Sequence, residues 1–186
     1  MHLFGFGNKK NNTEKNIMSR QNTSVSNVWW GNLLAALQDK NVCPNAFEDS
    51  RPEWLQIGLP PTQDRKVVRL ILKLRQQACQ GIDKPVDSPV VFNLYTPRGK
   101  KTLRKWFEIW SEGKKSELKL KGIQIIPGPL GNEQDNKGNA VVFVTGISWE
   151  KQDDATIQDI VKAFKSLKQW MINSKLDTVL PMLISK

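Results

Sequence analysis

Val90-Val91-Phe92-Asn93-Leu94-Tyr95 is a short run of β-branched and aromatic residues, with Pro89 before it and Pro97-Arg98-Gly99 after it. Such side chains favour strands, whereas proline and glycine interrupt them. A second valine-rich run follows at residues 140–145. The two runs predict strands, and we expect them to lie at the centre of one sheet.

The chain beyond residue 95 alternates between helical and strand patterns. The expected elements are a helix at 102–112, a strand at 118–126, the strand at 140–145, a helix at 156–173 and a last strand at 178–184. From residue 89 to residue 186 the order is therefore β-α-β-β-α-β, that of a ferredoxin-like α+β domain. Pro181 agrees with this topology, because the last strand lies at a sheet edge, where proline is tolerated.

Two helices are expected before this domain. The first spans about 27–39, and the second spans 62–81 with an apolar stripe and a basic opposite face. The stripe consists of Val67, Leu70, Ile71, Leu74 and Ala78. Residues 41–61 hold four prolines and read as a loop, from which Trp54, Leu55 and Ile57 pack on the core. The predicted organisation is a disordered basic tail (1–26), a helical segment packing on the core (27–88) and the ferredoxin-like domain (89–186).

Composition favours a globular intracellular protein. Of 186 residues, 39% are hydrophobic and 25% are charged, which is ordinary for a folded domain. No run of eighteen apolar residues occurs, and the N-terminus lacks the order of a secretory signal. We therefore expect a soluble cytoplasmic or nuclear protein. Oligomeric state cannot be read from these features.

The cysteine and histidine counts exclude a Cys/His zinc site, because such a site needs about four ligands. The chain has only Cys43, Cys79 and His2. Cys79 is interpreted as a buried, unreactive thiol. A Cys43–Cys79 disulfide is possible, but reduced thiols fit an intracellular protein better.

Catalytic patterns are missing from the sequence. His2, in the predicted tail, is the one histidine, so Ser-His-Asp and Cys-His arrangements have no base. No GxxxxGK[ST] or GxGxxG motif occurs, and no cofactor is predicted. The acidic residues Glu150, Asp153 and Asp154 precede a predicted helix, where capping is a simpler role than metal binding.

The positive charge is concentrated in one third of the chain. Residues 62–121 hold fifteen basic and six acidic residues, a net charge of +9 out of the chain's +10. Such asymmetry attracts anionic partners. The candidate nucleic-acid-binding residues are Arg65, Lys66, Arg69, Lys73, Arg98, Lys100, Lys101, Arg104, Lys105, Lys114, Lys115, Lys119 and Lys121.

Residues 137–144, Lys-Gly-Asn-Ala-Val-Val-Phe-Val, resemble the K/R-G-F/Y-G/A-F-V-x-F/Y segment of the RNA-recognition-motif family. The resemblance covers about half of the chain in topology and these eight residues in motif, and it implies RNA binding on a sheet face. The segment departs from the family at its stacking positions, which hold Asn139 and Val141 instead of aromatic residues. Candidate stacking residues are therefore Tyr95, Phe143 and Trp149.

These features favour a non-enzymatic protein that binds RNA or DNA mainly through phosphate contacts. One alternative is a structural or assembly protein, such as a matrix-like or adaptor protein, that binds acidic partners or an anionic membrane surface. A second alternative is a metal-dependent nuclease that uses Glu150, Asp153 or Asp154 in an unfamiliar site.

Overall fold

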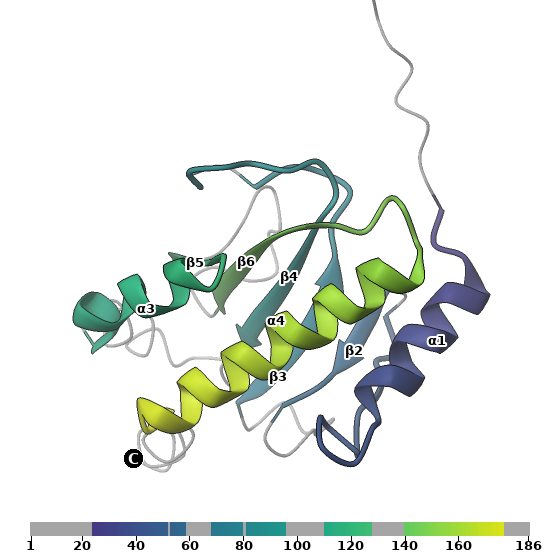
Figure 1. Cartoon of the computed structure of the whole chain (residues 1–186), viewed down its shortest axis with the longest axis horizontal. Coiled ribbons are helices and arrows are strands. Elements are labelled where there is room, and N and C mark those ends of the chain that lie inside the picture. Colours follow the sequence, from purple (N-terminus) through teal and green to yellow (C-terminus); the bar gives the residue numbers. More distant parts are fainter. Residues whose placement is uncertain are drawn as a thin grey trace, which may run out of the picture.

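The computed structural model describes residues 24–51, 53–58, 68–79, 81–95, 110–127 and 140–176. Its helices and strands, in chain order, are α1 (Asn27–Leu37), β1 (Phe47–Glu48), β2 (Trp54–Gln56), β3 (Arg69–Leu74), β4 (Pro89–Tyr95), the short 3-10 helix η1 (Glu112–Lys114), α3 (Lys115–Leu120), β5 (Ile123–Pro127), β6 (Ala140–Ser148) and α4 (Asp154–Asn173) (Figure 1). The predicted strand at 178–184, nearly all of the predicted tail and most of the predicted helix at 102–112 lie outside the described residues.

The six strands form one antiparallel sheet in the order β1-β2-β3-β4-β6-β5. The mixed α and β content is confirmed, and β4 lies at the centre of the sheet as expected, whereas β6 lies between β4 and the edge strand β5. The ferredoxin-like topology is not confirmed, and the strand order differs from it. In that topology the last strand would lie beside the first, yet the neighbour of β4 on that side is β3.

The predicted helix at 62–81 is wrong over the residues where the structure describes it. Residues 69–74 form β3, and Leu70, Leu72 and Leu74 are all buried in the core. Leu70 and Leu74 fit a helical stripe as well as a strand, because they are four residues apart. Leu72 separates the two patterns, since a helix would place it near the basic face and a strand places it beside Leu70 and Leu74.

Two further expectations need correction. The segment at 41–61, predicted to be a loop, contains the short strands β1 and β2. The predicted burial of Trp54, Leu55 and Ile57 is confirmed. The strand expected at 118–126 begins only at Ile123, because residues 115–120 form helix α3. The turn between them contains Gly122 at a φ of 75°, a conformation that favours glycine.

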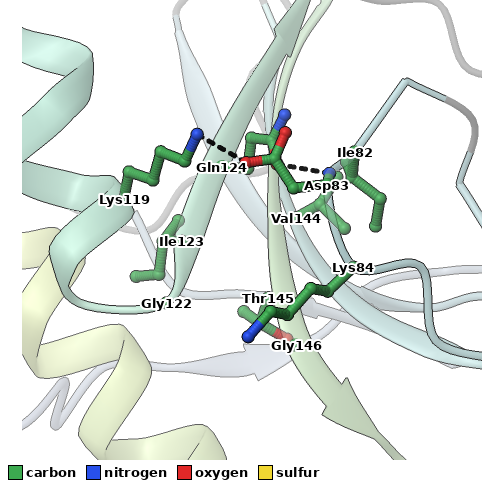
Figure 2. Close-up of a pocket in the computed structure, with 10 residues that line it drawn as sticks. All are labelled: Ile82, Asp83, Lys84, Lys119, Gly122, Ile123, Gln124, Val144, Thr145 and Gly146. Carbon is green, nitrogen blue, oxygen red and sulfur yellow. Dashed lines mark hydrogen bonds and ion pairs between the residues drawn. The ribbon is translucent and has the colours of Figure 1, made fainter.

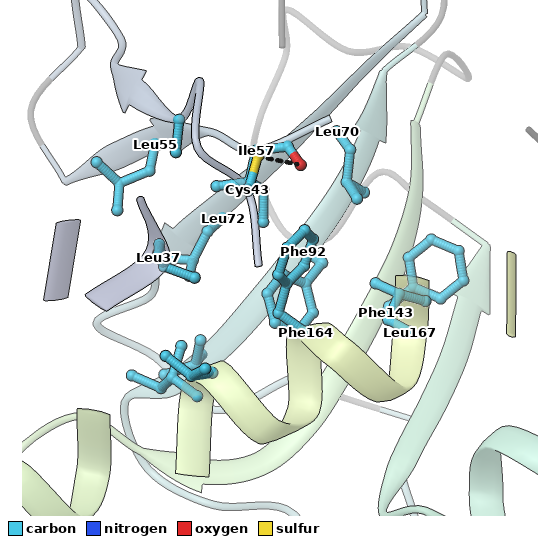
Figure 3. Close-up of a cluster of buried hydrophobic side chains, with 14 of the residues drawn as sticks. Leu37, Cys43, Leu55, Ile57, Leu70, Leu72, Phe92, Phe143, Phe164 and Leu167 are labelled. Carbon is cyan, nitrogen blue, oxygen red and sulfur yellow. Dashed lines mark hydrogen bonds between the residues drawn. The ribbon is translucent and has the colours of Figure 1, made fainter. Parts of the chain in front are cut away.

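Helices α1 and α4 pack on the same face of the sheet, where α4 runs across the strands (Figure 1). Both predicted helices are confirmed, and each begins at a capping side chain, Ser26 for α1 and Asp153 for α4. The main core lies between these helices and the sheet (Figure 3). Phe92 of β4 and Phe164 of α4 meet there with ring centroids 6.0 Å apart.

The opposite face of the sheet carries two smaller clusters. One consists of Cys79, Val91, Val142 and Val144, and the other of Trp54, Ile71 and Tyr95. Strand alternation produces this division, because every second side chain of β2, β3, β4 and β6 points away from the helices. The buried apolar side chains of α1, α3 and α4 belong to the main core and not to these clusters.

Within the described part of the chain, no helix has both the length and the apolar character needed to span a membrane.

Candidate functional site

Three cations lie over two aromatic rings on the sheet face that is turned away from α1 and α4. Lys73 of β3 is the cross-strand partner of Trp54, and its Nζ lies 4.5 Å from the Trp54 ring centroid. Arg69 of β3 is the cross-strand partner of Tyr95, and its Cζ lies 5.7 Å from that ring centroid. Arg51 lies over the Trp54 ring at 4.5 Å. We call Arg51, Trp54, Arg69, Lys73 and Tyr95 the cation–aromatic row.

Strand geometry explains why the row forms. Arg69, Ile71 and Lys73 alternate with core leucines, so all three point to the same face of β3. Side chains directly opposite one another on neighbouring antiparallel strands lie close enough to interact. The register therefore places each cation of β3 beside one ring.

The two rings are buried while the cations retain access to solvent. Trp54 is 8% exposed and Tyr95 is 4% exposed, whereas Arg51 is exposed and Arg69 and Lys73 are partly exposed. Cation–π contact holds a charged group over the ring without neutralising it. The row can therefore offer ordered positive charge, but it leaves little ring surface for stacking a base.

A carboxylate limits the positive charge at one end of the row. Partial burial acts to raise the pKa of Asp49, but hydrogen bonds and a nearby charge lower that pKa overall. The hydrogen bonds come from the Gln56 side chain, the Arg51 backbone N–H and the Ser50 hydroxyl, and the charge is that of Arg69. Asp49 is therefore ionised at neutral pH, and its negative charge offsets part of the positive charge of the row.

Two buried amides lie beside the row. Asn93 Nδ2 donates to the Tyr95 hydroxyl at 3.0 Å, and Gln56 Nε2 donates to Asp49. Among the described residues, nothing donates a hydrogen bond to Asn93 Oδ1 or Gln56 Oε1. These side chains fix the position of a ring and a carboxylate of the site.

The structure brings together only some of the predicted nucleic-acid-binding residues. Arg69 and Lys73 lie side by side in the row, on one face of a strand instead of on a helix. Lys114, Lys115, Lys119 and Lys121 lie in the separate segment of η1, α3 and the following turn. Outside the described residues are Arg65, Lys66, Arg98, Lys100, Lys101, Arg104 and Lys105.

Three of the four lysines near α3 have partners within the protein. Lys114 lies over the Trp110 ring at 4.6 Å and donates to the Trp110 carbonyl at 3.0 Å. Lys115 pairs with Glu112 at 3.5 Å, and Lys119 pairs with Asp83 at 2.5 Å. The two ion pairs are exposed, so they are screened by salt and can be exchanged for an external anion at little cost.

Phe143 and Trp149 do not fit the predicted stacking role, because both are fully buried. Phe143 packs in the main core against Trp170 of α4, with ring centroids 6.1 Å apart. Trp149 donates from Nε1 to the Arg75 carbonyl at 2.7 Å. Tyr95 lies on the other face of the sheet from Phe143, so these rings do not form one stacking surface.

The acidic residues before α4 have structural contacts. Asp153 caps the helix, as predicted, by accepting hydrogen bonds from the Thr156 N–H at 2.7 Å and hydroxyl at 2.6 Å. Glu150 accepts a hydrogen bond from the Ser88 hydroxyl at 2.7 Å. Over the described residues, no three His, Cys, Asp or Glu side chains are grouped so as to hold a metal ion.

The cysteines are free thiols on opposite sides of the sheet. Cys43 belongs to the main core, where its Sγ lies 3.5 Å from the Ile57 carbonyl oxygen (Figure 3), whereas Cys79 belongs to a cluster on the other face. The possible Cys43–Cys79 disulfide is therefore absent. Cys79 is buried, as predicted, although it lies in a loop and not in a helix.

Sequence reasoning missed Arg51 and gave Trp54 only a packing role. Both come from the segment that was expected to be a loop. The pairing of β2 with β3 brings them to Lys73, and no short motif indicates that pairing.

Comparisons of this chain with models of protein families, with curated proteins and with solved structures gave no match.

Proposed function

We propose that this protein binds nucleic acid, without catalysing a reaction on it, mainly through contacts between its cations and phosphates. The observation that carries the proposal is the cation–aromatic row, together with the net charge of +9 in residues 62–121. Phosphate contacts supply most of the affinity of sequence-independent binding.

The chemistry of the row suits phosphate better than bases. A guanidinium group stacked on a ring keeps its N–H donors at its edges, and an ammonium group above a ring keeps donors directed away from it. Ordering a long basic side chain on a ring in advance reduces the entropy lost when an anion binds. Because Trp54 and Tyr95 are buried, we expect little discrimination between sequences.

Binding of labelled RNA and DNA at low salt tests this proposal by fluorescence anisotropy. We expect Arg51→Gln/Arg69→Gln/Lys73→Gln to weaken binding at least tenfold for every sequence. The matched control, Lys151→Gln/Lys162→Gln/Lys165→Gln, removes three exposed charges from the other side of the molecule and should retain most of the affinity. Equal losses in the two variants, or binding by the unmodified protein no stronger than that of a neutral control, would overturn the proposal.

The absence of catalysis is tested separately. Labelled RNA and DNA incubated with the protein and Mg²⁺ or Mn²⁺ should stay intact. Cleavage that disappears when Glu150 or Asp153 is replaced would support the nuclease alternative instead.

A second candidate function is attachment to an anionic membrane surface, favoured by one specific feature. Leu120 at the end of α3 is 90% exposed, and it lies between Lys119 and Lys121. An exposed apolar side chain among lysines suits an anionic lipid surface, where each basic residue contributes roughly 1 kcal/mol. Co-sedimentation with phosphatidylserine vesicles tests it: Leu120→Ser should reduce binding, whereas Val28→Ser, at another exposed apolar residue, should not.

A further inference from the structure

A pocket lies between the loop at 81–84, the turn from α3 to β5, and β6 (Figure 2). Its volume is about 310 Å³, which is at the lower end for small-molecule sites. It is distinct from the cation–aromatic row, since the two have no residue in common.

The walls of the pocket are fixed by contacts between segments far apart in the sequence. The Gln124 side chain accepts a hydrogen bond from the Asp83 N–H at 3.0 Å and donates to the Gly81 carbonyl at 3.2 Å. The Asp83 carboxylate pairs with Lys119 at 2.5 Å. The 81–84 loop is therefore held to β5 by two hydrogen bonds, and the exposed Asp83–Lys119 ion pair adds a weak contact with α3.

The lining combines apolar side chains with charged groups. Ile82 and Val144 supply the apolar part, and Ile123 also lines the pocket, although its side chain is buried in the main core on the other face of the sheet. Lys84 extends past Thr145 toward Gly146 (Figure 2). Within the described part of the chain, Lys84 has no ion pair, whereas Lys119 is already paired with Asp83.

This distribution of charge favours a ligand that has an anionic group at one end and a hydrogen-bond donor at the other. An anionic group is attracted to the Lys84 end, and only a hydrogen-bond donor, such as a hydroxyl, suits the Asp83 end. An apolar ring or chain suits the isoleucine and valine side chains between them. A phosphate monoester on a hydroxylated sugar with a flat apolar group has these three features.

We propose that this pocket binds a nucleoside monophosphate unit, with its phosphate at Lys84 and a sugar hydroxyl at Asp83. The unit is either a free mononucleotide or the phosphorylated end of a strand. The second source rests on the proposed nucleic-acid-binding function, and the first does not.

Isothermal titration with adenosine 5′-monophosphate tests the pocket directly. We expect saturable binding, and binding at least tenfold weaker for adenosine and for inorganic phosphate, because each lacks part of the recognised chemistry. Lys84→Ala should weaken binding roughly tenfold or more, since it removes the charge-assisted contact. Lys121→Ala is the matched control, because it removes an exposed lysine that does not line the pocket.

A second variant fills the pocket without changing its charge. A side chain at Gly146 would meet no atom within 4 Å, and the residue lies in strand β6, so Gly146→Val is compatible with the fold. It should abolish binding of the mononucleotide while the unfolding temperature is retained. No binding by the unmodified protein, or equal losses in Lys84→Ala and Lys121→Ala, would overturn the assignment.

Oligonucleotides with a 5′-phosphate or a 5′-hydroxyl distinguish the two sources. If only the 5′-phosphorylated strand displaces the mononucleotide, the natural ligand is a strand end. If neither strand displaces it, the natural ligand is a free mononucleotide. If long strands bind and the mononucleotide does not, the pocket assignment fails and the proposed function stands. If the mononucleotide binds and long strands do not, the proposed function fails and the pocket assignment stands.

Discussion

Trp54 and Tyr95 stack on one another, with ring centroids 5.6 Å apart and planes inclined by 22°, although their strands are not neighbours. Strand β3 lies between β2 and β4, so the two rings lean over Ile71 to meet. Neighbouring strands are about 4.8 Å apart, and only long side chains can make such a contact. The stacked rings thus join three strands and form the base on which Arg51, Arg69 and Lys73 lie.

Trp54→Ala should lower the free energy of unfolding by about 3–5 kcal/mol, because it removes a large buried ring and its stacking contact with Tyr95. Urea denaturation monitored by circular dichroism measures this change. Val28→Ala, at a residue that is 74% exposed, should change the free energy by no more than about 0.5 kcal/mol. A similarly small effect of Trp54→Ala would contradict its burial.

Leu72→Ala distinguishes the observed strand from the helix that the sequence suggested. Leu72 is fully buried in the main core, so we expect a loss of about 2–5 kcal/mol in the free energy of unfolding. Lys73→Ala, at the next residue, should cost about 1 kcal/mol or less, because Lys73 is partly exposed and an exposed cation–π contact contributes about that much. The reverse order of the two effects would contradict strand β3.

This pair of residues also explains how far the sequence could predict the fold. Strongly patterned elements were predictable: α1, α4 and the valine-rich strands β4 and β6 lie where their periodicity indicates. Segment 69–74 was not, because Leu70, Ile71 and Leu74 fit a helical stripe while Leu70, Leu72 and Leu74 fit a strand alternation. Tertiary pairing with β2 and β4 selects the strand, and local sequence does not encode that pairing.

Asp153 should make stability depend on pH in the acid range. Hydrogen bonds from the Thr156 side chain and backbone are the main cause that lowers the pKa of Asp153 below its ordinary value of 3.8. A lowered pKa in the folded state means that the contribution is complete above the unfolded pKa and is lost as the pH falls through the folded pKa.

The unfolding temperature measured between pH 2 and pH 6 tests this capping role. Asp153→Asn retains a capping side chain but does not titrate, so we expect its difference from the unmodified protein to shrink below about pH 4. A difference that is the same at all these pH values would show that the charge of Asp153 does not contribute.

Both thiols should react slowly in the folded protein. Burial raises the pKa of the Cys43 thiol and that of the Cys79 thiol, which lowers the fraction of reactive thiolate at neutral pH. At pH 7.5 we expect little reaction with Ellman's reagent, followed by release of two equivalents in guanidinium chloride. Rapid reaction of one equivalent in the native protein would show that one thiol is accessible.

The candidate site was predictable in charge but not in geometry. The excess of cations in residues 62–121 is visible in the sequence, and Arg69 and Lys73 were among the predicted residues. Their aromatic partners were not predictable as a group, because Trp54 and Tyr95 are 41 positions apart and meet only through the register of β3. The stacking role predicted for Phe143 and Trp149 was wrong because their burial depends on tertiary contacts. Phe143 packs against Trp170 of α4, and Trp149 donates a hydrogen bond to the Arg75 carbonyl.

The salt dependence of nucleic-acid binding tests the central claim most directly. Each phosphate neutralised on a single strand contributes about −0.7 to the slope of log K against log salt concentration. If Arg51, Arg69 and Lys73 each contact one phosphate, the triple glutamine variant should have a slope about 2 units shallower than the unmodified protein. The control variant, Lys151→Gln/Lys162→Gln/Lys165→Gln, should keep the slope of the unmodified protein. An unchanged slope in the Arg51→Gln/Arg69→Gln/Lys73→Gln variant would contradict phosphate binding by the cation–aromatic row.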